Sequence, residues 1–230
     1  MKKTKVSCDL KSCDFCKRCL TEWLPAIDAN RQTLFFKKGK ILFTEGDPVS
    51  GMYFINSGVV KVHKKWSDEK ELIVRFANKG AIVGHRGLGT ELVFPVSATV
   101  IEDASVCFIP LEFFHASLKV NHDFLYWLML FFADELKLSE RRMRNLAHMS
   151  VKGRLALALI NLKDKFGKRD DGSIDIQLSK QDLASYAGAT YETVFRIMNE
   201  MEDEKLIIVS GKNIQIINAK ELVKISQPPL

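Results

Sequence analysis

The sequence predicts an α+β chain, in which an antiparallel β-domain is followed by a long helix and then by a winged helix-turn-helix. Three observations lead to this prediction. Between residues 34 and 110, short apolar runs alternate with turn signals at intervals of about eight to twelve residues. Residues 121–147 contain neither glycine nor proline and have a helical pattern. Residues 179–201 form two short helical segments around a glycine turn, and a hairpin pattern follows them.

The composition is that of a folded protein with a mild excess of positive charge. The 230 residues are 47% hydrophobic and 27% charged, and the formal net charge is +6. The excess lies in residues 1–20 and 137–154, and it permits an anionic partner without demonstrating one. The N-terminus lacks the apolar region of a secretory signal, and no apolar run reaches the ~18 residues of a membrane span. We therefore expect a cytoplasmic protein with no membrane segment.

The β-domain is expected to be a small antiparallel sandwich or barrel rather than a set of βαβ units, because its turn signals are closely spaced. Glycine-containing turns at Glu45-Gly46-Asp47, Ser57-Gly58 and Lys79-Gly80 are expected to separate its strands. The expected strands are residues 41–43, 52–55, 59–63, 72–76, 81–83, 97–101 and 105–109.

The long helix, residues 121–147, follows a short helix expected at residues 111–118. Its first half has a broad apolar face from Phe124 to Leu136, and its second half is more polar. Since apolar residues occupy more than one face, we expect this helix to pack against both the β-domain and a second copy of the chain. The alternative is a simple core helix.

The C-terminal part begins with a helix whose expected apolar face comprises Val151, Leu155, Ala158, Leu159, Leu162 and Phe166. A polar loop is expected at residues 163–173 and a short strand at 174–176. Two strands, residues 206–210 and 214–217, are expected to form a hairpin behind the helix-turn-helix. The tail from residue 218 to residue 230 is expected to be frayed.

The helix-turn-helix itself is the most informative stretch. Gln181–Tyr186 and Tyr191–Met201 are the expected helices, Gly188 supplies the positive φ of the turn, and Thr190 caps the second helix. The residues expected to be buried on the second helix are Val194, Ile197 and Met201, and those expected to face outward are Glu192, Thr193, Arg196 and Asn199.

The outward residues suit DNA reading. Glutamate can accept a hydrogen bond from the cytosine amino group, and arginine can form two hydrogen bonds with guanine. The alternative is an ordinary helical hairpin, in which Glu192 and Arg196 form an ion pair one turn apart.

Four of the five cysteines lie near the N-terminus, at Cys8, Cys13, Cys16 and Cys19. In an intracellular protein such a density points to a metal, redox chemistry or free thiols more than to disulfides. The spacing of the last three matches the first three ligands of a ferredoxin-type run, although no fourth cysteine followed by proline is present. The neighbouring Lys11, Lys17 and Arg18 are expected to lower the thiol pKa values.

The order of these parts, together with three groups of residues, closely resembles the CRP/FNR family of bacterial transcription regulators over residues 35–217. The first group lies in the β-domain and comprises Gly39, Glu45-Gly46-Asp47, Met52-Tyr53-Phe54-Ile55, Ser57-Gly58, Lys61-Val62, Gly80 and Val83-Gly84. The second group is Val151-x-Gly153-Arg154-Leu155, and the third is Glu192-Thr193-Val194 with Arg196.

The resemblance implies a β-roll, the jelly roll of cyclic-nucleotide-binding domains, within a chain of four parts. These parts are an N-terminal cysteine-containing segment with a short helix (1–32), the β-roll sensor domain (33–119), a long dimerisation helix (120–148) and a winged helix-turn-helix DNA-binding domain (149–230). The resemblance also implies a homodimer, whose two recognition helices enter successive major grooves of double-stranded DNA at a palindromic site. RNA polymerase is a further expected partner.

The resemblance also implies particular DNA contacts. Glu192 and Arg196 match the positions at which the family reads a TGA- or TTG-like half-site core. Tyr191 occupies another contact position without the family's usual arginine, and Phe195 replaces a residue that is small in some members. These two departures affect the outer half-site bases. The remaining candidates for DNA contact are Lys180, Thr190, Thr193 and Lys212, and phosphate contact is expected for Lys180, Thr190 and Lys212.

The comparison with the family argues against cyclic AMP as the signal. Its cyclic AMP binders carry Gly-Glu and Arg-Ser pairs, whereas this sequence has Gly84-His85 and Val96-Ser97. Without the arginine, the cyclic phosphate would be a buried, unpaired charge. A different effector could use a pocket formed by Gly84, His85, Arg86 and Ser97. His85 itself is expected to be a partly exposed loop histidine.

The FNR branch of the family suggests a different signal. Its members combine an N-terminal cysteine cluster with a distant cysteine in the β-roll, and Val106-Cys107-Phe108 resembles the segment that carries that cysteine. The implied metal ligands are Cys13, Cys16, Cys19 and Cys107, with Cys8 as a further candidate, and the implied cofactor is a [4Fe–4S] cluster. The spacing is tighter here than in the FNR branch. Zinc, a redox-active thiol set and the absence of a cofactor remain alternatives, so the cofactor is unknown from the sequence.

A DNA-binding transcription regulator is the favoured function. The alternative is an iron–sulfur or other metal- or redox-sensing protein whose helix-turn-helix binds a protein. An enzyme is not expected, because the sequence has no glycine-rich phosphate loop, no HExxH motif and no G-x-S-x-G motif.

Overall fold

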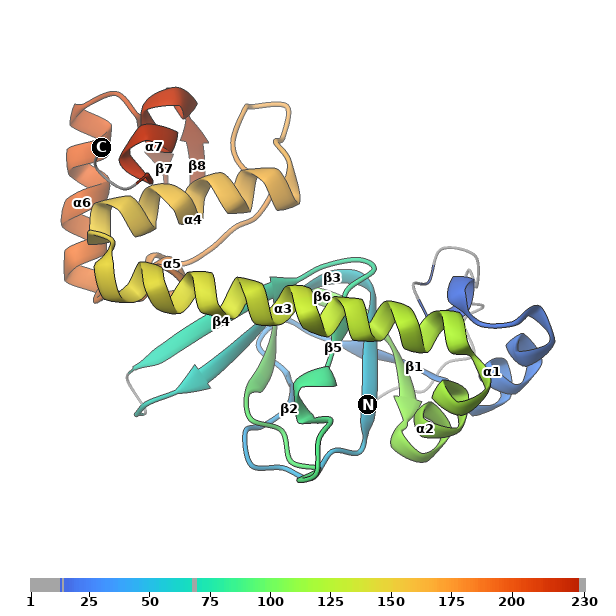
Figure 1. The fold of residues 1–230 in the computed structure, drawn as a ribbon. Coiled ribbons are helices and arrows are strands. Elements are labelled where there is room, and N and C mark those ends of the chain that lie inside the picture. The colour runs from blue at the N-terminus through green and yellow to red at the C-terminus, as the bar shows by residue number, and fades with distance from the viewer. Residues whose placement is uncertain (1–12, 14, 68–69, 228–230) are drawn as a thin grey trace. The chain divides into compact units, whose positions relative to one another are not determined.

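The computed structural model describes residues 13, 15–67 and 70–227. The chain divides into two compact units, Met1–Glu135 and Leu136–Leu230. The boundary falls inside α3 (His122–His148), so this helix begins in the first unit and ends in the second. Figure 1 labels the helices and strands of both units.

In the described part of the first unit, three short helical segments precede the sheet, and the first of them contains Cys16. They are η1 (Cys16–Arg18), η2 (Thr21–Trp23) and α1 (Leu24–Asn30). Pro25 lies in the first turn of α1, where a missing backbone N–H costs nothing because those donors have no helical partner. The short helix expected in the N-terminal segment is therefore present.

The antiparallel sheet that follows is the β-domain expected from the sequence. Its strands are β1 (Gln32–Phe36), β2 (Ile41–Phe43), β3 (Gly51–Lys65), β4 (Glu71–Ala77), β5 (Ile82–Val83) and β6 (Ser97–Pro110). They pair in the order β1-β6-β3-β4, while β2 pairs with β6 and β5 pairs with β3. The register sets Cys107 of β6 opposite Thr33 on one side and Phe54 on the other. Cys107 is thus held between two strands.

Two breaks expected from the sequence do not exist. β3 runs through Ser57-Gly58, and β6 runs through residues 102–104. The pairing of the two strands shifts register around Ser57, as it does at a β-bulge. Gly58 has a φ of +81°, and a Cβ at this position would lie 2.3 Å from the carbonyl oxygen of Asp103. The glycine therefore permits a bulge between closely paired strands, which a local pattern cannot distinguish from a turn.

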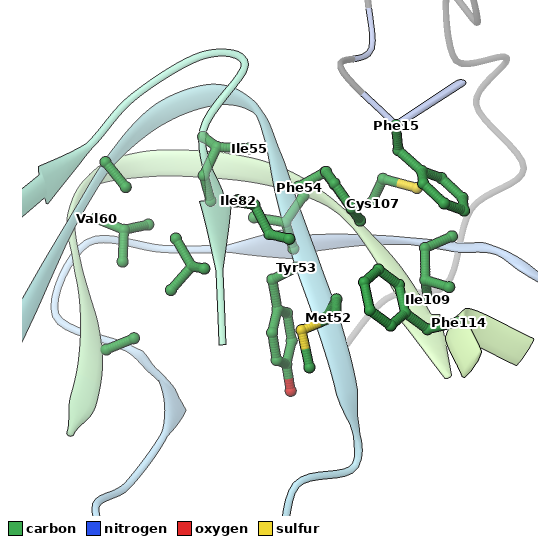
Figure 2. Packing of buried hydrophobic residues seen from close by; sticks show 14 of the residues in the cluster. Phe15, Met52, Tyr53, Phe54, Ile55, Val60, Ile82, Cys107, Ile109 and Phe114 are labelled. Atoms are coloured by element: carbon green, nitrogen blue, oxygen red, sulfur yellow. The ribbon is translucent and has the colours of Figure 1, made fainter. Parts of the chain in front are cut away.

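The core of this unit joins the sheet to the N-terminal segment. Figure 2 shows Phe15 beside Cys107, among the buried side chains of β3, β6 and α2 (Leu111–Val120). The Phe15 ring stacks on Phe54 with a centroid distance of 5.1 Å, and it meets Phe124 of α3 edge-on at 4.8 Å. Full burial of such a side chain contributes about 1.5–3 kcal/mol. Phe15 is therefore an anchor for the residues that follow Cys13.

The helices α2 and α3 confirm the helices expected at residues 111–118 and 121–147. Phe124 and Leu128 of α3 are nearly fully buried. The helix also carries large apolar side chains that are exposed, namely Leu125, Tyr126, Met129, Leu130, Leu136, Leu138, Met143 and Leu146. The apolar residues thus cover more than one face, as expected. Among the described residues, no helix has the combination of length and apolar character that a membrane span requires.

The second unit has the order of a winged helix-turn-helix, as predicted. Its further elements are α4 (Val151–Phe166), α5 (Lys180–Ala187), α6 (Tyr191–Asp203), β7 (Ile207–Ser210), β8 (Asn213–Ile216) and α7 (Ala219–Ile225). The strands β7 and β8 pair antiparallel and form the expected hairpin.

α4 reaches Phe166, as its expected apolar face does, and it includes the first residues of the loop expected at 163–173. Two local expectations for this unit are wrong. In place of the strand expected at residues 174–176, the structure has isolated bridges between Lys168 and Ile174 and between Ser173 and Gln215. The tail is not frayed over its whole length, because α7 packs against α4 and buries Leu222 completely. Tertiary packing explains why α7 forms, because burial of one leucine can stabilise a short helix whose intrinsic helix propensity is modest.

Candidate functional site

Side-chain caps hold both helices of the helix-turn-helix. Ser179 Oγ accepts a hydrogen bond from the Asp182 N–H at 3.0 Å, at the start of α5. Thr190 Oγ1 accepts one from the Thr193 N–H at 3.3 Å, at the start of α6. Between the two helices, Gly188 has a φ of +66°, in the left-handed region that favours glycine. The expected cap at Thr190 and the expected turn glycine are confirmed.

The helix α6 buries one face and exposes the other. Its buried residues are Val194, Ile197, Met198 and Met201, which include the three expected from the sequence. The exposed face carries Tyr191, Glu192, Phe195 and Arg196. Thr193 is half-buried, and its hydroxyl lies 3.0 Å from that of Thr190. Both threonines therefore serve the cap at the start of α6.

Arg196 is held at the surface by its own helix. Its guanidinium forms an ion pair with the Glu200 carboxylate, one turn further along α6. The helical-hairpin alternative expected Glu192 as this partner, and the structure has Glu200 instead. An exposed pair of this kind contributes only about 0.3–0.5 kcal/mol. Little stability is lost, therefore, when Arg196 leaves Glu200 for another partner.

Arg154 has a role that was not expected from the sequence. Its guanidinium donates to the carbonyl oxygens of Met149 at 2.7 Å, Ala187 at 2.9 Å and Gly188 at 3.1 Å. The last two carbonyls belong to the last residue of α5 and to the glycine that follows it, where backbone acceptors lack helical partners. Arg154 thus fixes the turn of the helix-turn-helix to α4. Its place in the Gly153-Arg154 motif was the sequence signal, but the motif alone does not reveal these partners.

The two candidate lysines lie in different settings. Lys180 begins α5, and its ammonium group lies 4.3 Å from the centroid of the Phe195 ring. Lys212 is exposed in the turn between β7 and β8. The hairpin is tied to α6, because the backbone N–H of Val209 donates to the Glu202 carboxylate at 2.8 Å. Lys180 therefore lies against α6, and Lys212 lies at the tip of the hairpin.

In the β-roll, His85 belongs to a buried cluster. Its exposed fraction is 2%, so the expectation of a partly exposed loop histidine is wrong. The ring contacts Phe131 and Phe132 of α3, with centroid distances of 4.9 and 5.7 Å. Residues of α3 thus cover the short helix η3 (His85–Gly87), and a contact between such distant residues leaves no local sequence signal.

Glu135 of α3 joins this cluster to two arginines. Its carboxylate accepts hydrogen bonds from Arg75 at 3.0 Å and from Arg86 at 2.6 Å. His85 Nε2 lies 3.6 Å from the same carboxylate. Burial alone would raise the pKa of Glu135, but His85 and the two arginine charges outweigh it and lower the pKa to about 2. Burial lowers the pKa of His85 despite the nearby Glu135 carboxylate.

The other candidate pocket residues make different contacts. Gly84 has a φ of +97°, and a Cβ there would lie 3.4 Å from the ring of Phe94. Ser97 Oγ accepts a hydrogen bond from the Glu45 N–H at 2.9 Å. Val96 is 6% exposed and belongs to the core. Arg86 therefore binds Glu135, whereas Ser97 binds the loop after β2. The sequence had suggested that both residues line one pocket.

The described cysteines come together in one hydrophobic cluster. Cys13, Cys16 and Cys107 are buried, and the half-buried Cys19 packs against the same core. Cys8 lies outside the described residues. In the part of the chain that the structure describes, no three His, Cys, Asp or Glu side chains converge in a way that could hold a metal ion. The N-terminal segment thus packs into the core that contains Cys107, but the described thiols do not converge as metal ligands.

The expected lowering of the thiol pKa is wrong for Cys19. Burial, together with the nearby Cys13, raises the pKa of Cys19 to about 12. Arg18 does not offset this effect, and its guanidinium lies 4.6 Å from the ring centroid of Trp127. Lys11 lies outside the described residues. Because metal ligation requires thiolates, this arrangement holds a protonated thiol, and ligation would require the segment to rearrange.

Comparison with known proteins matches both units. Residues 33–121 match the cyclic nucleotide-binding domain, and residues 153–225 match the Crp-like helix-turn-helix domain. The Anaerobic regulatory protein of Bacillus subtilis (strain 168) is 30% identical over 208 residues, which cover 89% of this chain and 86% of that protein. The chain belongs to the CRP/FNR family of transcription regulators.

Other CRP/FNR proteins agree with this assignment. The cAMP-activated global transcriptional regulator CRP of Escherichia coli O6:H1 is 31% identical over 184 residues, covering 78% of this chain and 86% of that protein. The structure of FixK2 from Bradyrhizobium japonicum has the same fold, with a TM-score of 0.77 at 22% identity, over 87% of this chain and 99% of that one. Membership makes the chain a transcription regulator rather than an enzyme, and its helix-turn-helix implies DNA as a partner.

Two features of the chain lie outside the two domain matches. Cys13, Cys16 and Cys19 precede the cyclic nucleotide-binding match, whereas Cys107 lies within it. Glu135 lies beyond the end of that match and before the start of the next. Neither domain match therefore covers the N-terminal cysteines or Glu135.

Proposed function

We propose that this regulator binds DNA as a homodimer and that α6 of each chain reads one half of a palindromic site. The observation that carries the proposal is the exposed face of α6, where Glu192 and Arg196 stand one turn apart. Arginine pairs with guanine O6 and N7, and glutamate accepts from cytosine N4. Lys180 and Lys212, together with the N-terminus of α6 at Thr190, are the proposed phosphate contacts.

The proposed dimer interface is α3. Apolar residues recur along it with alternating spacings of four and three, and five of these positions are 38–63% exposed: Leu125, Met129, Leu136, Met143 and Leu146. Phe132 and Ser139 fill the intervening positions. This spacing is the heptad pattern of a coiled coil, in which a second helix buries the same positions. By resemblance to the family, RNA polymerase is the expected protein partner, and the cytoplasm is the expected location.

Selection from random DNA with the full chain should enrich a palindrome with half-site centres about 10–10.5 base pairs apart. Arg196→Ala should then weaken binding by about 1–3 kcal/mol at the guanine that Arg196 reads, because two hydrogen bonds to that base are lost. Fluorescence anisotropy at one fixed salt concentration measures both affinities.

Glu200→Ala is the matched control for this experiment. It removes the ion-pair partner of Arg196 and leaves the arginine free to reach the base, so affinity should stay the same or increase. An equal loss by Arg196→Ala on matched and mismatched operators would contradict base reading. An enriched site without two-fold symmetry would contradict the dimer.

We propose that the sensed signal acts through the cysteines rather than through a cyclic nucleotide. A cyclic phosphate near η3 would have to displace Glu135, whose carboxylate is 2.6 Å from Arg86. The Val96 side chain, in the place of the family's arginine, offers no charge. The relative from Bacillus subtilis is an anaerobic regulator by name, which is consistent with a redox signal for a protein of this type.

Cys13, Cys16, Cys19 and Cys107 are the residues that would hold a [4Fe–4S] cluster. The donor set fits in its chemistry, because thiolates hold such clusters, and the described thiols would have to converge to do so. When bound, such a cluster supplies one-electron redox chemistry.

This chain's own residues connect the cysteine segment to α3. Arg18 lies over Trp127, and the Leu20 N–H donates to Asn121 Oδ1 at 2.7 Å. A rearrangement of the segment would therefore act on the first turns of α3, a helix that continues into the DNA-binding unit.

Protein purified without oxygen is expected to contain iron and to absorb visible light. Cys16→Ser should lose the iron because it removes one ligand, whereas Cys8→Ser should keep it because the four proposed ligands are intact. Iron analysis and absorption spectra measure both without any DNA. A colourless, iron-free protein whose DNA binding ignored oxygen would remove the cluster from the proposal, and bound zinc would replace it with a different metal.

A further inference from the structure

Two aromatic rings form an apolar patch on the exposed face of α6. Tyr191 and Phe195 are 40% and 39% exposed. Their rings are stacked, with a centroid distance of 6.1 Å and an interplanar angle of 11°. In sequence the two residues directly precede Glu192 and Arg196, the proposed base-reading pair. The helix already buries four other apolar side chains, so this ring pair is not needed for the core.

The ring of Phe195 is held in position by a positive charge. The Lys180 ammonium lies 4.3 Å from its centroid, which is within the range of a cation–π interaction. Tyr191 supports the ring from the N-terminal side by stacking. Phe195 is thus fixed between a lysine and a tyrosine, both on elements of the helix-turn-helix, rather than being free to turn away from the surface.

The chemistry of the major groove offers one apolar group to such a ring. Cytosine, adenine and guanine present hydrogen-bond donors and acceptors there, whereas thymine also presents its C5-methyl group. An aromatic ring cannot satisfy the polar edges, but it can bury a methyl group. We propose that Phe195, supported by Tyr191 and Lys180, reads the methyl group of a thymine next to the base pairs read by Glu192 and Arg196. This inference rests on the proposed DNA-binding role of α6.

The size of the effect follows from the burial of one methyl group. Removal of a single buried methyl or methylene group weakens an interaction about fourfold. A palindromic site presents the contact twice to a dimer, so replacement in both half-sites should weaken binding roughly 16-fold if the two contacts are independent.

The experiment replaces thymine by deoxyuridine, which keeps the base pair and removes only the methyl group. With the operator enriched by selection, each thymine of the half-site is replaced symmetrically, one position at a time, and binding of the full chain is measured. We expect one position, or two adjacent ones, at which affinity falls by about fourfold per half-site. Phe195→Ala should bind the thymine operator more weakly and should no longer distinguish thymine from deoxyuridine at that position.

Val223→Ala is the matched control, because Val223 is also an exposed apolar residue of the second unit, at 41%. It should retain the full preference for thymine. Equal affinity of the unaltered protein for every deoxyuridine operator would overturn the inference, and so would a Phe195→Ala variant that kept the preference. Neither result would affect the proposed function, which fails separately if selection enriches no sequence at all.

Discussion

Glu135→Ala is expected to lower the free energy of unfolding of the first unit by about 2–4 kcal/mol. The change leaves Arg75 and Arg86 without the carboxylate that both now share at 3.0 and 2.6 Å. Removing one partner of a fully buried ion pair costs about 3–5 kcal/mol, and partial exposure of this cluster lowers that figure. Urea unfolding followed by tryptophan fluorescence measures the effect, because Trp23, Trp66 and Trp127 all precede the unit boundary.

Glu140→Ala is the control for this change, since Glu140 is exposed on the same helix. It should alter the unfolding free energy by less than about 0.5 kcal/mol. If the cluster acts as one unit, the effects of the substitutions should not add. The double variant Glu135→Ala/Arg86→Ala should lose less unfolding free energy than the sum of the losses in the two single variants. Equal stability of Glu135→Ala and Glu140→Ala would show that the cluster does not hold α3 to the sheet.

The pH dependence provides a second test of the same carboxylate. Because the folded-state pKa of Glu135 is lowered from 4.5 to about 2, its contribution is complete above pH 4.5 and is lost as the pH falls toward 2. Glu71 also has a pKa of about 2, despite its burial, because of His63 and Lys61, and it acts in the same window. Glu135→Ala should therefore lose less stability between pH 5 and 2 than the unaltered protein.

The sequence predicted the fold wherever a local pattern decided the structure. The cap at Thr190, the left-handed Gly188 and the apolar spacing of α6 are properties of neighbouring residues, and all three are confirmed. The prediction failed where distant segments decide. Gly58 has the same positive φ in a bulge as in a turn, and the paired strand β6 makes it a bulge. Similarly, α7 is stable because Leu222 is buried in the second unit.

The candidate sites follow the same division. The exposed positions of α6 could be predicted because a helix with one buried face must expose the other. His85 could not be placed correctly, since its burial depends on Phe131 and Phe132 of α3. The pKa of Cys19 was misjudged because nearby basic residues are visible in a sequence, whereas burial in a core is not. Arg154 was missed because backbone carbonyl partners have no sequence signature.

Phe15→Ala is expected to release the cysteine segment from the β-roll and to cost about 3–5 kcal/mol, the usual range for removing a buried phenylalanine side chain. Phe15 is fully buried between Phe54 and Phe124, so its loss opens the core over Cys107. In a Cys8→Ser background, the thiols should then react faster with a disulfide reagent. Greater exposure should also lower the pKa of Cys19 toward its ordinary value of 9.0.

Phe35→Ala is the matched control, because Phe35 of β1 is 44% exposed and its loss leaves the core closed. Its effects on the thiol reaction rate and on the unfolding free energy should both be much smaller than those of Phe15→Ala. If both variants react at the same rate, Phe15 is not the anchor and the thiols are reached by another route. If only Phe15→Ala reacts faster, docking of one aromatic side chain controls both the access to the thiols and their ionisation. Any ligand of Cys16 or Cys19 must then compete with the docking of Phe15. A change at the cysteines would therefore also affect two neighbouring contacts. Arg18 contacts α3, and Leu20 contacts Asn121, the residue before α3.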